Sequence, residues 1–323
     1  MKVHTLDIDS SERDPILYPN QNSYTIELKN PVYNVSKIKL LSAKIPNSQL
    51  ILNSTNNTFS IDNIEFSLTN TNYSNGFNLA SDLELLISAP QSNVSSVTFD
   101  PDTNSLLFSN TGTATNPDPT LHPFSLQFYS GVNGYNSEEI GKTTPHQVLG
   151  FSGLDYNSDN GTIQSGNVNF NGPNDIILRI SDGSNDFNKS VYSNIPYYTG
   201  RILTTGDVIN YNGGDDPIDY IFHSGDHKTL RHLKFEFFYM SHGRLIPYDF
   251  RNQDHVLKLE LECSLSKVEN LPRVSHDLFE LPPPISIPEF KNPYKWKEYI
   301  YISAIIVVGS LLMMLIRPRR ISE

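Results

Sequence analysis

The residues with the greatest capacity for chemistry are three histidines, His223, His227 and His232. Two histidines four positions apart can share a metal ion when they lie on one face of a helix. The residues between His223 and His227 are Ser-Gly-Asp, which favour a turn over a helix. The spacing therefore predicts a histidine pair in a loop, without a metal site.

The other reactive side chains show no catalytic arrangement. The single cysteine, Cys263, lies on the apolar face of a predicted strand, whereas a nucleophilic thiol needs an exposed, electropositive setting. Asp215 and Asp216 stand in a Gly-Asp turn typical of a solvated surface. His242 and Gly243 predict a hairpin turn, because glycine permits the backbone that such a turn needs. With no phosphate-binding loop and no Gly-x-Ser-x-Gly motif, we predict no catalytic, cofactor-binding or metal-binding residue.

An uncharged apolar stretch, residues 299–316, is the most informative segment of the chain. As an α-helix it would reach about 27 Å, just enough to cross a hydrocarbon core of about 30 Å. Aromatic residues precede it and arginines follow it, as at the two faces of a membrane. A buried core helix is the alternative, although core helices rarely stay apolar on every face. The predicted anchor residues are Trp296, Tyr299, Tyr301, Ile305, Ile306, Leu311, Leu312, Arg317, Arg319 and Arg320.

The composition of the remaining chain favours short strands joined by many turns. Only 18% of the residues are charged, while Asn, Ser, Gly and Pro are abundant. A net charge of −11 gives no general reason to expect nucleic-acid binding. One cysteine fits a reducing compartment. Since the amino-terminal residues lack a signal-peptide pattern, we expect the anchor to insert after synthesis, leaving the large domain on the cytosolic side.

Alternating apolar residues predict strands along most of residues 1–270. Hairpin turns are expected at Asp62-Asn63 and over residues 100–104. Residues 78–89 carry the one helical pattern of this region, which Pro90 ends. The clearest strand patterns lie at 2–8, 22–28, 35–45, 175–181, 233–239 and 256–265, with a short break expected at 31–35.

These elements predict an all-β fold, an antiparallel jelly-roll β-sandwich with one flanking helix. The sandwich is expected over residues 1–270, with an exposed insertion loop at about 152–174. Residues 271–298 form a Pro-rich linker, expected to act as a semi-rigid spacer. A single C-terminal transmembrane helix at 299–316 and a basic tail at 317–323 follow.

Several short motifs, taken in order, resemble one known family. Residues 7–14 read DIDSSERD, 19–28 read PNQNSYTIEL and 35–46 read VSKIKLLSAKIP. NYS at 72–74, HQVLGF at 146–151, LKFEFF at 233–238 and LKLELE at 257–262 follow, with Gly243 and Asp249-Phe250 between the last two. Over roughly residues 5–265 this order resembles the jelly-roll minor capsid, penton-like proteins of nucleocytoplasmic large DNA viruses.

The resemblance implies a structural protein of an icosahedral shell built around an internal membrane, with no catalytic residues to carry over. The Pro-rich linker and the anchor depart from the simplest members of that family. They indicate a membrane-anchored variant, and they make a pentamer at the vertices of the shell less favoured.

The functional hypothesis is a minor capsid protein that tethers the capsid shell to the internal viral membrane. Its expected partners are the major capsid protein, other minor capsid proteins and inner-membrane lipids, with no cofactor and no specific nucleic acid. We expect it in the virion, between shell and membrane, as a single-pass protein with its large domain on the cytosolic, capsid side. Basic residues flank the helix equally, so charge alone does not orient it.

Two alternatives remain open. One is a host-type tail-anchored adaptor whose β-sandwich binds a soluble protein. The other is a membrane-bound hydrolase whose two carboxylates lie far apart in the sequence.

Overall fold

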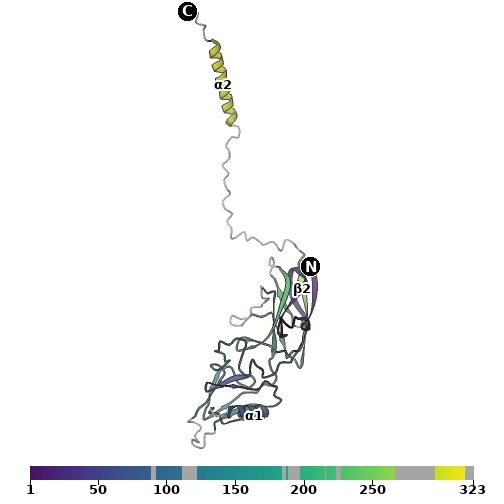
Figure 1. Ribbon diagram of the computed structural model, residues 1–323, viewed down its shortest axis with the longest axis vertical. Helices are drawn as coiled ribbons and strands as arrows, with labels where there is room; N and C mark the ends of the chain where they lie inside the picture. The colour runs from purple at the N-terminus through teal and green to yellow at the C-terminus, as the bar shows by residue number, and fades with distance from the viewer. Residues whose placement is uncertain are drawn as a thin grey trace, which may run out of the picture. The chain divides into compact units, whose positions relative to one another are not determined.

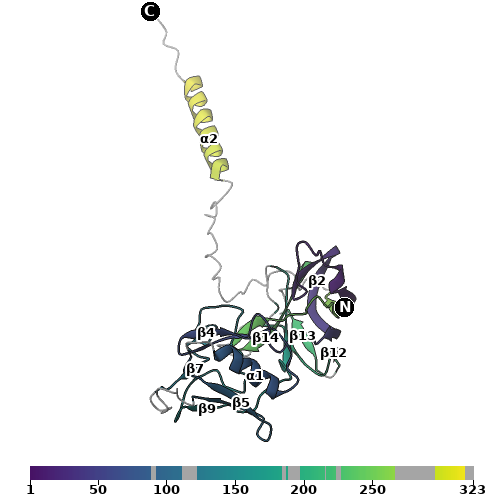
Figure 2. The same cartoon turned by 60° about the horizontal axis from the view of Figure 1, so that its bottom comes forward.

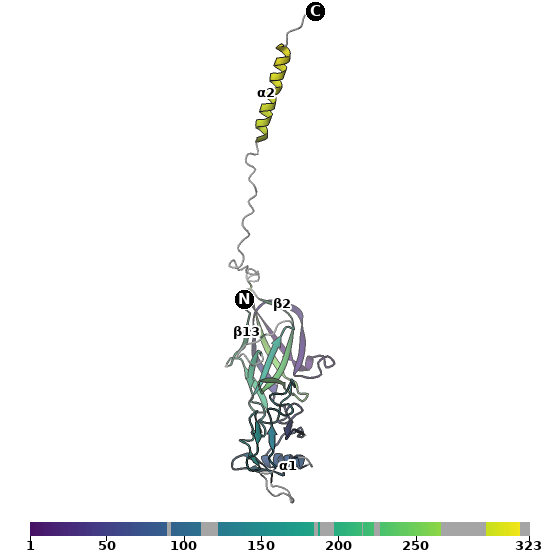
Figure 3. The same ribbon diagram turned by 90° about the vertical axis from the view of Figure 1, so that its left-hand side faces the viewer.

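The computed structural model describes residues 1–88, 92–110, 122–183, 187, 197–214, 216–222, 227–265 and 295–316. The chain consists of two compact units, Met1–Pro272 and Arg273–Glu323. We call the first unit the β-domain. Its amino terminus and strand β2 lie at one end of this domain, and helix α1 lies at the other (Figures 1 and 3).

Within the described residues the β-domain is almost entirely antiparallel sheet. Its one α-helix is α1, Gly76–Ile87, and a 3-10 turn spans Ser10–Glu12. The strands are β1 Lys2–Asp9, β2 Ser23–Pro46, β3 Thr58–Ile61, β4 Ile64–Ser67, β5 Ser96–Asp100, β6 Ser105–Ser109, β7 Ser125–Gln127, β8 Asp155–Asn157, β9 Thr162–Gln164, β10 Asp175–Ser181, β11 Gly200–Leu203, β12 Val208–Asn212, β13 Ile218–Ile221, β14 Lys228–Ser241, β15 Arg244–Pro247 and β16 Val256–Cys263.

Strand β2 is the centre of a nine-stranded sheet with the order β1-β16-β2-β14-β10-β11. Strands β12 and β13 also pair with β2, and β15 pairs with β14. The first half of β2 pairs with β14, whereas its second half, from Val35 to Lys44, pairs with β16. The same strand therefore belongs to both layers of a sandwich.

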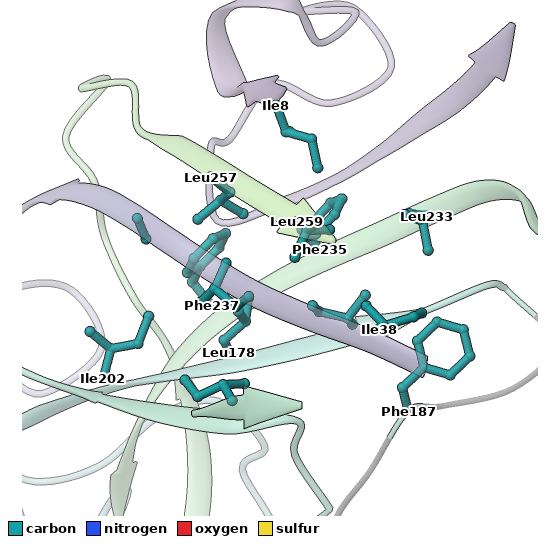
Figure 4. Close-up of a cluster of buried hydrophobic side chains, with 14 of the residues drawn as sticks. Ile8, Ile38, Leu178, Phe187, Ile202, Leu233, Phe235, Phe237, Leu257 and Leu259 are labelled. Atoms are coloured by element: carbon teal, nitrogen blue, oxygen red, sulfur yellow. The ribbon is translucent and has the colours of Figure 1, made fainter. Parts of the chain in front are cut away.

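Apolar side chains from the two layers meet in one buried cluster, which we call the sandwich core. Figure 4 shows Ile8 and Leu257 on one side of this cluster and Leu178 and Ile202 on the other, with Phe237 between them. On β16, alternate residues are buried, as a strand with one covered face requires. The predicted all-β class and antiparallel sandwich are confirmed.

The break expected at residues 31–35 is wrong, because β2 continues through Pro31 as a single strand. Register shifts against β14 occur between the pairs Glu27–His232, Val32–Leu230 and Val35–Lys228. These bulges accommodate proline, which has no N–H to give to a regular ladder. Asn34 adopts a φ of 57° at the second bulge, a conformation that asparagine tolerates well.

A second buried cluster lies in the chain between β2 and β10, and we call it the inserted core. Two small sheets enclose it, with the orders β4-β3-β7-β8 and β5-β6-β9. Helix α1 packs against β5 and β6, and Leu79, Leu83 and Ile87 on its inner face are buried. Figure 2 shows α1 beside these short strands.

Local sequence explains the hairpins and the helix of this region. Asp62 and Asn63 both have positive φ, as the predicted two-residue turn between β3 and β4 demands. The hairpin of β5 and β6 is likewise where the sequence predicts it. The Asn75 side chain accepts a hydrogen bond from the Asn78 amide and so caps α1, which begins two residues earlier than predicted.

The exposed insertion loop predicted at about 152–174 is wrong. This segment contributes β8 to one small sheet and β9 to the other, and buries Ile163 and Val168 in the inserted core. Polar neighbours hide both apolar residues in the sequence, so the segment has no visible period. The insertion is therefore much longer than expected, and it folds around its own core.

Candidate functional site

The second unit contains α2, Lys295–Ile316, the one described helix long and apolar enough to cross a membrane. Its 22 residues extend over about 33 Å at about 1.5 Å per residue. Ser303 and Ser310 donate their hydroxyl protons to the carbonyls of Tyr299 and Ile306, both at 2.8 Å. The helix thus satisfies its own interior polar groups, which a hydrocarbon environment requires.

The predicted anchor residues of α2 are all exposed. Their exposed fractions are 57% for Trp296, 65% for Tyr299, 69% for Tyr301, 71% for Ile305, 62% for Ile306, 56% for Leu311 and 52% for Leu312. A core helix rarely stays apolar on every face, whereas α2 carries no charged side chain from Tyr299 to Ile316. The helix begins at Lys295, within the segment predicted as linker, because Trp296, Lys297 and Glu298 continue the helical turn.

Several predicted residues lie outside the described residues. These are the tail arginines Arg317, Arg319 and Arg320, the loop residues His223 and Asp215, and the linker from residue 271 to residue 294.

Cys263 lies on a buried face of its strand, as the sequence predicts. Cys263 is buried at the end of β16, and burial raises the pKa of its thiol. A raised pKa disfavours the reactive thiolate. In the described part of the chain, no three His, Cys, Asp or Glu side chains are grouped so as to hold a metal ion.

A serine, an aspartate and a histidine meet where the 3-10 turn contacts the segment before β16; Ser10 lies in the first motif of the family resemblance, and Asp254 and His255 lie outside it. Ser10 donates a hydrogen bond to Asp254 at 2.8 Å, and the His255 amide donates to the Ser10 hydroxyl at 2.9 Å. The His255 ring instead contacts the Tyr24 hydroxyl at 2.9 Å. Because the imidazole does not reach the serine, this is not a nucleophile with its base. The hydrogen bonds of Ser10 with Asp254 and His255 instead hold the 3-10 turn against the segment before β16.

Sequence reasoning missed one cluster, which we call the histidine junction. His146, from the turn that follows Pro145, stacks on His242, from the β14–β15 turn, with ring centroids 4.1 Å apart. The Thr144 hydroxyl lies 2.9 Å from His146 Nδ1 and 3.4 Å from His242 Nε2. The junction connects the inserted core to the sandwich. No local pattern could have found it, because its two rings come from distant segments.

Other polar contacts join the two cores beside these rings. Thr143 and Ser241 hydroxyls lie 2.6 Å apart, and Thr55 and Tyr239 hydroxyls lie 3.0 Å apart. Arg244 donates hydrogen bonds to backbone carbonyls of residues 134, 135, 137 and 139.

A cavity of about 210 Å³ lies next to these contacts. Thr144 and Ser241 line one part of it, and Asp175 and Arg201 another. The Asp175 carboxylate lies 3.2 Å from Arg201, and burial raises the pKa of this carboxyl group. The ion pair neutralises the cavity, which favours structural water over a charged ligand.

Comparisons with known proteins find one family model. Residues 3–120 match a family of unknown function (DUF5901), which is well under half of the chain. No curated protein sequence matches the chain.

Two solved structures of virophage proteins resemble the chain. The mavirus penton protein is 10% identical with a TM-score of 0.37, and the match covers 82% of this chain and 100% of that one. A chain of the Sputnik virophage, solved by cryo-EM at 3.5 Å, is 12% identical with a TM-score of 0.28, covering 81% and 98%. Both identities and both TM-scores are low.

Proposed function

We propose that this chain is a non-enzymatic structural protein of a virion, a minor capsid protein whose α2 helix holds the β-domain to an internal membrane. The observation that carries the proposal is that α2 is long enough to cross a membrane and carries large apolar side chains and no charge from Tyr299 to Ile316. Burying such a side chain contributes about 1.5–3 kcal/mol, so the helix gains most by entering lipid. The order of sequence motifs that resembles minor capsid proteins supports the assignment to a shell.

The β-domain supplies the shell contacts in this proposal. Its partners are the major capsid protein and other minor capsid proteins, while α2 contacts the lipids of the inner membrane. The Pro-rich sequence of residues 271–294 is that of a semi-rigid spacer between these two functions. Each contact with a neighbouring subunit is weak, but many membrane-bound copies raise the effective concentration and strengthen the whole.

Membrane flotation tests the anchor. Full-length protein synthesised in the presence of phospholipid vesicles should float with them, whereas a chain truncated after Leu271 should remain in the dense fractions as a folded domain. The double variant Ile306→Lys, Leu311→Lys should lose flotation, because each central charge costs about 2.5–3.5 kcal/mol on insertion. The matched control is Ile306→Leu, Leu311→Ile. Flotation of the lysine variant with the control would refute the anchor.

Particle fractionation tests the capsid role. Mild detergent applied to purified particles should remove lipid and leave the full-length protein on the shell. Release of the protein together with the lipid would support the tail-anchored adaptor instead. Particles assembled with the chain truncated after Leu271 should lose the regular spacing of the membrane beneath the shell, and normal spacing would contradict tethering.

Orientation is tested separately with an epitope tag after Glu323. In intact membranes a protease added from the cytosolic side should degrade the β-domain and spare the tag. Cleavage of the tag without detergent would reverse the proposed orientation.

A further inference from the structure

The histidine junction places two imidazole rings where a positive charge has little compensation. His146 is only 4% exposed, and His242 is partly buried between His146 and Tyr135. The two rings lie nearly parallel, at an interplanar angle of 21° and a centroid distance of 4.1 Å. This stacking suits two neutral rings and disfavours two cations.

The backbone on both sides fixes the rings in this place. His242 has a φ of 52° and precedes Gly243, which also has positive φ, so the β14–β15 turn determines the position of the ring. A Cβ atom on Gly153 would lie 2.5 Å from the His242 ring, which shows how closely the chain packs there. The His242 ring therefore has little room to turn away from His146. If both rings became charged, their repulsion would be relieved by separation of the His146 turn from the β14–β15 turn.

The charged groups around the junction do not compensate a proton on either ring. On the sandwich side, the cation Arg244 lies close enough to His242 to disfavour a proton on its ring. On the inserted side, Glu138, Glu139 and Lys142 are exposed in the loop that leads to the junction. Asp155 accepts hydrogen bonds from the amides of residues 129 and 130. Among the described residues, no carboxylate forms a hydrogen bond with either ring.

These surroundings shift both titrations in the same direction. Burial, together with the neighbouring His242, lowers the pKa of His146 to about 3. Burial, together with Arg244, lowers the pKa of His242 to about 4. A lowered pKa means that the closed junction is fully favoured above the ordinary histidine pKa of about 6.5 and becomes progressively less favoured as the pH falls below it.

We propose that the histidine junction is an acid-sensitive latch, which closes the inserted core onto the sandwich when both rings are neutral and opens when they take up protons. Among the described residues, polar contacts that join the cores beside the rings include those of Arg244, Thr143–Ser241 and Thr55–Tyr239. Thr144 and Ser241, which adjoin the two rings in the sequence or by hydrogen bond, line the neighbouring cavity of about 210 Å³. The ligand of this device is the proton itself.

Hydrogen exchange on the full-length chain in detergent micelles tests the latch. Amide protection is measured between about pH 7.5 and about pH 4 and corrected for the intrinsic pH dependence of exchange. Peptides that cover residues 129–146 and 239–247 should lose protection as the pH falls below about 6.5. Peptides of β2 and β16 should remain protected at the same pH, since both cores stay folded.

Two variants connect the effect to the rings. His242→Asn keeps a residue that tolerates positive φ and should move the midpoint of opening to lower pH by about one unit. The double variant His146→Gln, His242→Asn should abolish the pH dependence of the junction peptides. His4→Asn on β1 is the control and should leave the midpoint unchanged.

A disulfide across the junction tests the same idea without altering the histidines. Thr143→Cys, Ser241→Cys replaces two hydroxyls that lie 2.6 Å apart, and the oxidised chain should keep its junction protected at low pH. Reduction should restore the acid sensitivity. Loss of junction protection only together with that of β2 and β16, or an unchanged midpoint in His242→Asn, would overturn the proposal.

Discussion

The sandwich core is built from long strands, 24 residues in β2 and 14 in β14, whereas no strand of the inserted core exceeds five residues. Long strands pair segments far apart in the sequence and bury large side chains from two layers. The inserted core combines two hairpins, α1 and short-range hydrogen bonds such as those of Asn53 and Asn56 with the short pairings β3–β7 and β6–β9. Short strands and local contacts allow a region to open independently of its neighbour.

These differences in strand length predict that the two cores of the β-domain unfold with unequal cooperativity. If β2 is the common support, damage to the sandwich core reaches the inserted core, while damage to the inserted core stays local.

The largest effect should come from removing a buried ring. Phe237→Ala should lower the free energy of unfolding by about 3–5 kcal/mol, because Phe237 is fully buried against Phe250 and His255. In the inserted core, Phe128 packs against Phe59 and Phe151 in the same way. Phe128→Ala should therefore open the inserted core and leave the sandwich core folded.

Urea unfolding of full-length protein in detergent, combined with hydrogen exchange, checks both variants. Protection of β14 and β16 should fall in Phe237→Ala and persist in Phe128→Ala. Equal losses in the two variants would show that the cores unfold as one unit.

Acid should weaken the sandwich core through His255. Burial lowers the pKa of His255 to about 4, against about 6.5 for an ordinary histidine. The unfolded chain therefore binds the proton first, so the contribution of His255 to stability is full above about pH 6.5 and falls by at most about 1.4 kcal/mol per pH unit down to about pH 4. His146 and His242 add slopes of the same sign, so His255→Gln, which keeps a polar partner for Tyr24, should reduce the total slope in urea titrations by the His255 share. A slope identical to that of the unmodified chain would exclude His255 as its source.

A helix cap should matter less and only locally. Asn75→Ala removes the side chain that caps α1 and should cost about 0.5–2 kcal/mol. Asn75→Ser retains a capping oxygen and serves as the control. Exchange of α1 amides should quicken in the alanine variant alone, with β2 unaffected. Faster exchange throughout β2 would contradict the expected asymmetry.

The smallest effect should come from an exposed ion pair of the sandwich. Lys258 lies 3.3 Å from Asp7, but the side chains are 47% and 71% exposed. Solvent screens such a pair, so Lys258→Ala should change the unfolding free energy by less than about 1 kcal/mol. Thermal unfolding at low and high salt measures this change in free energy. A larger decrease that does not depend on salt would indicate that the aliphatic part of Lys258 contributes to packing.

The sequence by itself determined the elements with a local physical signal. The two-residue turn at Asp62-Asn63 requires positive φ, which aspartate and asparagine tolerate. The alternation in β16 reports one covered face, and the uncharged stretch of α2 predicts a helix of membrane-spanning length. Each of these signals arises from neighbours within a few residues, where propensity and periodicity act.

Only the tertiary structure decided how the strands are grouped into two cores. Pro31 indicates a break in isolation, but the bulges against β14 remove the need for its missing N–H. Ile163 is one apolar residue between polar ones, and its burial follows from pairing with β6. The histidine junction joins segments about 100 positions apart, as the Thr144–His242 contact shows. Such contacts depend on how distant strands fold together, and no local window of the chain records them.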